Sequence, residues 1–256
     1  MHKNKLLSTF SLISIIVLIL VSLSSLALLF FSDNASNKLF PNYIRDIFHQ
    51  DLSEKEAFTL VYKDNVWGDG SGIGSQPKNA IPYLDIQQQL LFDDKIQSIV
   101  DLGCGDWQLM KELTIPNNKS YIGYDLVETI IQENRRKFER KNIHFVQIDS
   151  LADLKNVTAD LLILKDVMHH WPNQHIQYAI DSIIPNYKYA LIINDYKPFA
   201  KNEDIEFGQF RPLDLSKSPF RLNNNYRVIL DYPSHGIVKR IYFYTRSFEK
   251  SIKKEQ

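Results

Sequence analysis

The chain has 256 residues, of which 44% are hydrophobic and 23% are charged, and its formal net charge is zero. These values fit one full-sized folded domain with an appendage and exclude a disordered chain. The sequence contains no long basic run interleaved with aromatic residues, so we expect no nucleic-acid partner. The single cysteine, Cys104, excludes an intrachain disulfide and a thiolate metal cluster.

The first expected element is a membrane helix. Residues 6–32 carry no charge and are mostly Leu, Ile, Val, Phe and Ser, which is enough to span a bilayer as a helix. The run is longer than a signal-peptide core and ends without a small-residue cleavage pattern, which favours a retained signal anchor over residues 1–32. Lys3 and Lys5 favour a cytosolic N-terminus and a single-pass membrane protein.

Residues 33–60 predict a stalk and an entry helix, and residues 61–95 predict a glycine-rich segment followed by a helix. Residues 61–75 contain four of the nine glycines in the chain. Glycine allows positive φ angles and close approach of the backbone to a ligand. From composition alone, a covering lid and a flexible connector fit this segment equally well.

From Ile96 onward, short apolar runs alternate with amphipathic ones, which is typical of a doubly wound, mostly parallel α/β sheet. We expect this domain to span residues 96–248, with a polar tail at 249–256. Helices are expected over 128–141 and 173–184, the second beginning after Pro172. Residues 227–231 and 238–245 predict a C-terminal antiparallel hairpin joined by residues 232–237. The parallel strands are expected at 98–102, 120–124, 143–148, 161–165 and 189–194.

A glycine turn follows the first expected strand. Gly103 and Gly105 would let the chain turn sharply and leave bare backbone for a ligand at the carboxyl end of that strand. A dinucleotide fingerprint would need a third glycine, and the carboxylate of Asp106 would repel a pyrophosphate. The turn therefore disfavours NAD and FAD and favours a cationic ligand.

Two further acids end the second and third expected strands. Asp125 lies at the spacing from which a carboxylate can accept hydrogen bonds from a ribose diol, although it could instead cap the following helix. Asp149 lies where a side chain can reach an adenine edge, and capping of a turn is an equally good interpretation.

Together these residues resemble the class I S-adenosylmethionine-dependent methyltransferases over residues 85–246. The resemblance rests on the segments 101–105, 123–125 and 160–166, on Asp149, and on the final hairpin. The motifs Trp67-Gly68, Ser71-Gly-Ile-Gly-Ser75, Lys165-Asp-Val-Met-His-His-Trp-Pro172, Asn194-Asp-Tyr196 and Arg211-Pro-Leu-Asp-Leu215 resemble a largely bacterial subgroup of that family. The family implies a Rossmann-like fold with S-adenosylmethionine as cofactor.

The resemblance also assigns residues to the cofactor. Asp101, Gly103 and Gly105 would shape the pocket for its methionine part, and Asp106 would pair with its ammonium. Asp125 would hold the ribose, and Asp149 with Ser150 would face the adenine. The segment from Trp67 through Gly72 and Gly74 to Ser75 would close over the cofactor, and the motif places Lys165 beside it.

Methyl transfer from a sulfonium requires alignment and exclusion of water, and a base where the acceptor is a hydroxyl or a protonated amine. Asp166, His169 and His170 follow the fourth expected strand, and we select His170 with Asp166 as the catalytic pair. One histidine of this motif could equally cap the helix or pack under Trp171. The spacing of His169, His170 and His175 does not favour a metal site, so we expect no metal.

The remaining candidates belong to the acceptor side. His169, Asn194, Asp195, Arg211 and Asp214 are expected to contact the substrate. Four aromatic residues between the fifth strand and the hairpin would line the acceptor pocket or anchor the loop, namely Phe199, Phe207, Phe210 and Phe220.

The sequence thus predicts a membrane-anchored methyltransferase acting on a small-molecule, sugar or lipid-linked acceptor. The alternative is a catalytically inactive cofactor-binding module that acts as a membrane-tethered interaction protein. The side of the membrane stays open, because the lysine distribution places the domain outside the cytosol whereas the methyl donor is made inside it.

Overall fold

The structure is a computed structural model and describes residues 52–68 and 70–246. These residues lie in the second of two compact units, which begins at Asp51. The expected membrane helix, most of the stalk and the polar tail lie outside the described residues. Among the helices that are described, none has the length and apolar character needed to span a bilayer.

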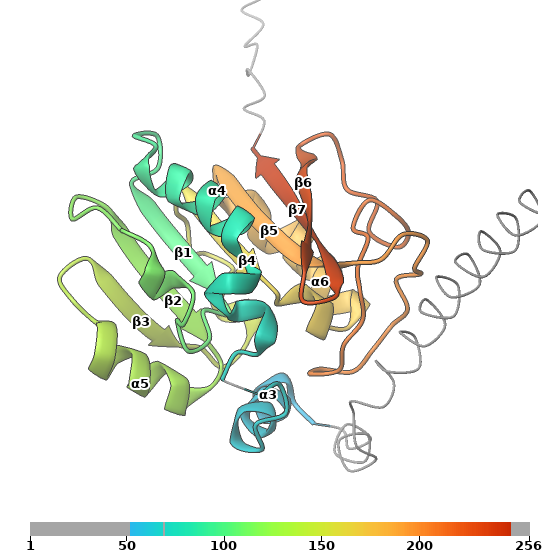
Figure 1. Cartoon of the computed structure of the whole chain (residues 1–256), viewed down its shortest axis with the longest axis horizontal. Coiled ribbons are helices and arrows are strands. Elements are labelled where there is room, and N and C mark those ends of the chain that lie inside the picture. The colour runs from blue at the N-terminus through green and yellow to red at the C-terminus, as the bar shows by residue number, and fades with distance from the viewer. Residues whose placement is uncertain (1–51, 69, 247–256) are drawn as a thin grey trace, which may run out of the picture. The chain divides into compact units, whose positions relative to one another are not determined.

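A seven-stranded sheet forms the centre of the domain, in the order β3-β2-β1-β4-β5-β7-β6 (Figure 1). The first five strands are parallel, and β7 pairs antiparallel with both β5 and β6. The order reverses between β1 and β4, which makes their carboxyl ends the switch point where ligands bind in open α/β sheets. The strands are β1 Ser98–Leu102, β2 Ser120–Asp125, β3 Ile143–Gln147, β4 Leu161–Lys165, β5 Tyr189–Tyr196, β6 Tyr226–Ser234 and β7 Ile237–Thr245.

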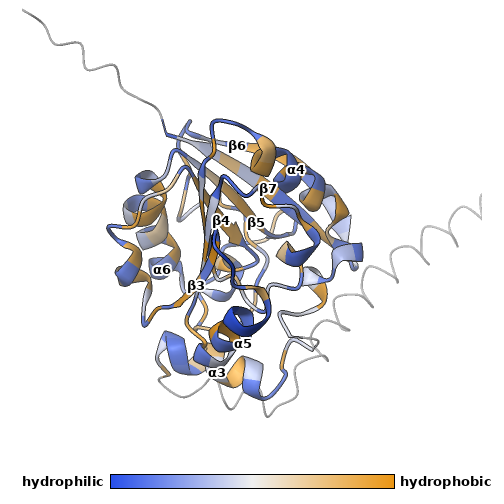
Figure 2. Ribbon diagram, turned by 90° about the vertical axis from the view of Figure 1, so that its left-hand side faces the viewer, coloured by the Kyte–Doolittle hydropathy of each residue, from blue (hydrophilic) through white to orange (hydrophobic). Residues whose placement is uncertain are grey.

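Helices cover both faces of this sheet, and Figure 2 shows α4 and α6 on opposite sides of it. Each face has its own hydrophobic core: one includes Tyr83 and Leu91 of α4, and the other includes Ile176 of α6 and Phe58 of α3. The α-helices are α3 Glu54–Lys63, α4 Ile81–Phe92, α5 Glu128–Phe138 and α6 Asn173–Tyr178. Short 3₁₀ helices occupy Ile73–Ser75, Pro77–Asn79, Met110–Glu112, Leu151–Leu154, Met168–His170 and Ile184–Asn186, and a π-helical turn spans Ala179–Ile183.

The expected doubly wound sheet and hairpin are present, although several element boundaries differ. Helix α5 ends at Phe138, not at 141, because Arg140 turns back to form a bridge with Ile143. The helix expected over 173–184 is an α-helix only to Tyr178 and then widens into the π-helical turn. The hairpin connection shortens to His235-Gly236, both with positive φ, and the boundary expected at residue 61 falls inside α3.

Candidate active site

The glycine turn lies at the carboxyl end of β1 and is bound to β2. The backbone N–H groups of Gly103 and Cys104 both donate to the carbonyl of Tyr124, at 2.8 and 3.0 Å. Gly103 has a φ of 73°, and a Cβ there would lie 2.6 Å from Val167 Cγ2. Any side chain at this position would therefore collide with the segment after β4.

Asp125 ends β2 and holds the same turn. Its Oδ2 accepts the N–H of Gly105 and its Oδ1 accepts the N–H of Val127, each at 3.0 Å. Burial raises the pKa of this carboxyl, while the backbone donors oppose that effect. A carboxylate has about four acceptor sites, so the backbone donors leave part of its capacity for a diol.

Asp101 lies beneath the turn in a chain of buried hydrogen bonds. Trp107 Nε1 donates to the Tyr121 hydroxyl at 2.8 Å, and that hydroxyl donates to Asp101 Oδ2 at 2.6 Å. Burial raises the pKa of Asp101 to about 6, although the hydrogen bond from Tyr121 lowers it. The chain fixes the orientation of this carboxyl below the backbone of the turn.

The glycine-rich segment lies over the turn and is attached to Asp106. The Ser71 hydroxyl donates to Asp106 Oδ1 at 2.7 Å and accepts the Asp106 N–H at 3.1 Å. Tyr62 of α3 is within 2.8 Å of the same hydroxyl. Residues 67–75, which we call the covering segment, are therefore held against the turn by Ser71.

Trp67 begins the covering segment and stacks on His170, with ring centroids 4.6 Å apart and planes at 28°. His170 Nδ1 lies 2.8 Å from the carbonyl of Gln209. A carbonyl can only accept, so Nδ1 carries the proton and Nε2 keeps its lone pair in the neutral ring. Burial lowers the pKa of His170 well below its usual value, so the ring is neutral near pH 7.

His169 has the opposite arrangement. Its Nδ1 accepts the backbone N–H of Asp195 at 3.2 Å, so Nε2 carries the proton of the neutral ring. Burial lowers the pKa of His169 to about 3. Of these two histidines, His170 has the free lone pair that a base needs. The ring of Trp171 contacts His175, with ring centroids 4.8 Å apart.

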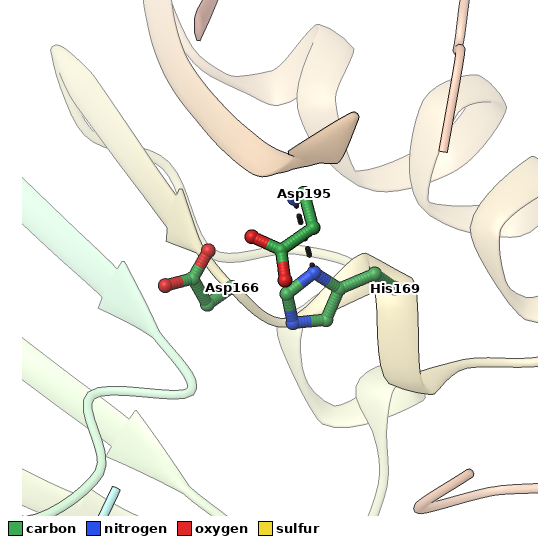
Figure 3. Close-up of side chains that lie close together, drawn as sticks. All are labelled: Asp166, His169 and Asp195. Atoms are coloured by element: carbon green, nitrogen blue, oxygen red, sulfur yellow. Dashed lines mark hydrogen bonds between the residues drawn. The ribbon is translucent and has the colours of Figure 1, made fainter. Parts of the chain in front are cut away.

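An ionic cluster lies beside the histidines, at the ends of β4 and β5. Asp166, His169 and Asp195 point toward one another (Figure 3). Lys239, which pairs with Asp195 in the register of β5 and β7, contacts Asp195 and lies 2.7 Å from Asp166 Oδ1. Lys165 Nζ lies 2.6 Å from Asp166 Oδ2. Two ammonium groups thus neutralise two carboxylates in a buried site.

The pKa values in this cluster follow from burial and these contacts. Burial would raise the pKa of Asp166, but Lys165 and Lys239 outweigh it and hold the pKa below its usual range. Burial would lower the pKa of Lys239, but the two carboxylates raise it above normal. Burial dominates for Lys165 and Asp195, so the pKa of Lys165 is lowered and that of Asp195 is raised.

Asp166, His169 and Asp195 are close enough together to supply ligands to a metal ion. The ammonium of Lys239 already lies between the two carboxylates, where a cation would have to bind. His169 Nδ1 is also engaged by a backbone donor. The donor set therefore does not fit a metal in this arrangement, and the expected absence of a metal stays a prediction.

The covering segment also reaches the ionic cluster. Lys165 Nζ donates to the Gly74 carbonyl and to the Ser75 hydroxyl, both at 3.2 Å. A Cβ on Gly74 would lie 3.1 Å from Lys239 Nζ and 3.2 Å from Asp166 Oδ2. Gly72, with a φ of 87°, supplies the bend before this contact.

Other expected site residues have structural partners. The Asp149 side chain is 80% exposed and pairs with Lys55 of α3 at 2.7 Å, and Ser150 begins the 3₁₀ helix that follows. Buried Arg211 donates to Asn173 Oδ1 at 2.8 Å, which fastens its loop to α6. Asp214 Oδ1 accepts the backbone N–H of Ser216 at 3.1 Å within the same loop.

Asn194 differs, because it is fully buried on β5 and neither atom of its amide has a hydrogen-bond partner among the described residues. The four loop phenylalanines differ in their burial and contacts. Phe220 is buried, Phe207 packs on His175, Phe210 packs on His169, and Phe199 is 92% exposed. Phe207, Phe210 and Phe220 thus have packing partners or are buried, and the lining of an acceptor pocket stays a prediction.

Sequence reasoning missed Ser71, Tyr62 and Lys239. Ser71 lies within the quoted glycine-rich motif, so its position was visible although its contact was not. Lys239 lies in the second strand of the expected hairpin, and only the register of β7 on β5 places it against Asp195.

Part of the chain matches a known protein family. Residues 99–186 match a family model described as a methyltransferase domain. The chain is similar to the structure of an S-adenosylmethionine-dependent methyltransferase from Anabaena variabilis, with 12% identity over 77% of this chain and 96% of that chain and a TM-score of 0.54. Among curated protein sequences, none matches the chain significantly.

A second similar structure is described as the conversion of a disulfide bond into a thioacetal group during echinomycin biosynthesis. Its identity is 16% over 77% of this chain and 94% of that chain, with a TM-score of 0.53. At these identities the solved structures establish the fold, which is the Rossmann-like α/β fold of methyltransferases. The family-model match makes residues 99–186 a methyltransferase domain, and S-adenosylmethionine is the cofactor of this enzyme.

Proposed function

We propose that this methyltransferase is anchored in a membrane and methylates a small-molecule, sugar or lipid-linked acceptor, with His170 as the base. The observation that carries the choice of base is the hydrogen bond from His170 Nδ1 to the Gln209 carbonyl, which leaves Nε2 free. The bound cofactor supplies an electrophilic methyl group on a sulfonium.

The residues around the glycine turn fit such a cofactor. Gly103 and Gly105 let Val167 and Ser71 lie close against the turn, and Asp125 retains acceptor capacity for a ribose diol. The carboxylates of Asp101 and Asp106 give this end of the sheet the negative potential that a cationic ligand needs. In our proposal Asp106 exchanges its bond with Ser71 for the ammonium of the cofactor.

The acceptor would lie between the ionic cluster and His170. His170 Nε2 takes the acceptor proton, and the stacked ring of Trp67 holds the imidazole plane and excludes water from that side. Lys239 and Lys165 keep Asp166 ionised, and Asp166 offers an acceptor for a substrate hydroxyl. The unpaired amide of Asn194 supports a ligand group on this side of β5, because a buried amide without a partner destabilises the fold.

Membrane anchoring rests on the uncharged run of residues 6–32. The run makes the chain a single-pass membrane protein, with the N-terminus in the cytosol by the placement of Lys3 and Lys5. In our proposal the acceptor lies at or near the bilayer, and the anchor keeps the enzyme close to it.

The full chain in bilayer nanodiscs, supplied with methyl-deuterated S-adenosylmethionine, tests the proposal against a lipid extract and a water-soluble extract. We expect deuterated methyl to appear in a product of one extract. The change His170→Gln should lower the rate about 100- to 10,000-fold, because base catalysis contributes that much. His144→Gln, which alters an exposed histidine paired with Glu139, is the matched control and should leave the rate unchanged.

Two outcomes would contradict parts of the proposed function. Binding of S-adenosylhomocysteine without transfer to either extract would favour the inactive membrane-tethered module. An unchanged rate in His170→Gln would show that the stacked histidine has a structural role and that the base lies elsewhere or is not needed.

A further inference from the structure

An exposed groove lies on the loop between β5 and β6, outside the site described above. It has a volume of about 950 Å³ and is lined by residues 199–203, 216–219 and 221–222. Its rim carries Phe199, whose exposed fraction of 92% is the largest among the exposed large hydrophobic residues of the described chain. We call these lining residues the basic groove.

The charges of the basic groove are unbalanced. Lys201, Lys217 and Arg221 line it together with one acid, Glu203. Lys201 and Arg221 have no ion-pair partner among the described residues, and Lys217 reaches only Asp214, at 3.8 Å. In a chain with no net charge, this grouping makes a local positive surface.

The groove is held in shape by the loop that forms it. Asn202 Nδ2 donates to the carbonyls of Asp214 and Ser218 at 2.8 and 2.9 Å, and Asn202 Oδ1 accepts the Asp214 N–H at 2.9 Å. Phe220 and Leu215, which belong to the same connection between β5 and β6, are buried. Phe199 has a φ of 64°, and its ring lies 5.8 Å from Lys217 Nζ. The aromatic and cationic groups are thus presented together on a fixed loop.

This combination fits the interfacial layer of a bilayer. Cationic side chains bind anionic headgroups, and an exposed aromatic ring gains by entering the boundary between headgroups and acyl chains. The sequence also supplies a tether, because residues 33–51 can span about 60 Å when extended. That reach is enough for the groove to meet the membrane that holds residues 6–32.

We propose that the basic groove docks onto an anionic lipid surface, with headgroup phosphates between Lys201, Lys217 and Arg221 and with Phe199 in the interfacial layer. The inference rests on the proposed membrane anchoring. Docking orients the domain on its tether, so that its acceptor side has a fixed relation to the bilayer.

The test uses the full chain in nanodiscs of phosphatidylcholine alone or with phosphatidylglycerol. Ala200→Cys places a polarity-sensitive fluorophore in the groove while Phe199 stays in place, and Lys141→Cys places it on an exposed residue between α5 and β3. Cys104 is buried, and burial raises the pKa of its thiol, so labelling falls on the introduced cysteine. Wild-type chain treated in the same way measures residual labelling.

We expect a blue shift and quenching by lipid-borne quenchers only for the probe at 200 and only with phosphatidylglycerol, both reversed by salt. Each basic residue near an anionic surface changes the ratio of docked to undocked protein about fivefold. The double change Lys201→Ala with Arg221→Ala should therefore lower that ratio about 25-fold. Lys111→Ala with Lys141→Ala removes the same charge outside the groove and should leave the ratio unchanged.

Three results overturn the proposal. A chain that stays in the nanodiscs without any response at residue 200 overturns the docking surface and leaves the anchor intact. Equal responses with both lipids overturn the role of the cations. A chain that associates with neither kind of disc overturns both the anchor and the docking surface.

Discussion

Asp101 is the residue whose ionisation should be most visible in the stability of the domain. Its pKa lies near 6 in the folded protein, above the value of 3.8 for the free side chain, because it is buried. A raised pKa means that the folded state binds the proton more tightly. The contribution is therefore fully present below about pH 4 and is lost as the pH rises through about 6.

We expect Asp101→Asn to remove this loss while keeping an acceptor for the Tyr121 hydroxyl. The shift of about two pKa units corresponds to about 3 kcal/mol as an upper value. Urea unfolding of the ligand-free protein between pH 4 and pH 7 measures this effect. The free energy of unfolding of the variant should increase relative to that of wild type as the pH rises. A constant difference across that range would mean that Asp101 does not titrate there.

Substitution of Lys239 tests how much the buried ion network contributes to the stability of the domain. It is 2% exposed and contacts Asp166 and Asp195. Lys239→Met would leave both carboxylates short of a cation, and breaking a buried pair in this way costs about 3–5 kcal/mol. Urea unfolding at pH 7 measures the loss, and adding Asp195→Asn should recover part of it. Additive effects of the two changes would show that the contact is not energetically coupled.

At the scale of elements, the covering segment depends on glycines with positive φ. Gly70 has a φ of 66°, and a Cβ there would lie 2.0 Å from Asp106 Oδ2. Gly70→Ala should therefore lift the segment from the turn and speed amide hydrogen exchange over residues 67–75. Gly68→Ala is a matched control, because its φ is 65° and nothing lies within 4 Å of the added atom.

Both substitutions carry the same backbone penalty, so their difference isolates the collision with Asp106. Equal exchange in the two variants would show that the seating of the segment does not depend on this contact. Calorimetric titration with S-adenosylhomocysteine then shows whether seating and cofactor binding are linked.

The order of elements was largely readable from the sequence, and their contacts were not. The apolar runs that contain Asp101 or end at Asp125 and Lys165 predicted three parallel strands, because parallel strands buried on both faces have continuous apolar sequences. The pairing of Lys239 with Asp195 depends on strand register, which no local pattern specifies. The hydrogen-bonded nitrogen of each histidine likewise depends on the loop carbonyl or backbone amide that packs against it, far away in sequence.

At the scale of the whole molecule, the described domain and the uncharged N-terminal run make separate predictions. The domain accounts for the fold and the cofactor, and its described helices contribute no membrane span. We expect stable association of the full chain with a bilayer to depend on the uncharged run of residues 6–32, with the basic groove adding a weaker, salt-sensitive contact.

Membrane fractionation of cells expressing the full chain tests this division. The chain should stay with the membrane after carbonate extraction. Leu18→Arg with Leu20→Arg places two charges in the run, each costing about 2.5–3.5 kcal/mol at the centre of a membrane helix, and should release the protein. Leu18→Ala with Leu20→Ala, which keeps the run uncharged, should not. Release of wild type by carbonate would show that residues 6–32 do not span the bilayer, while leaving the assignment of the methyltransferase domain unchanged.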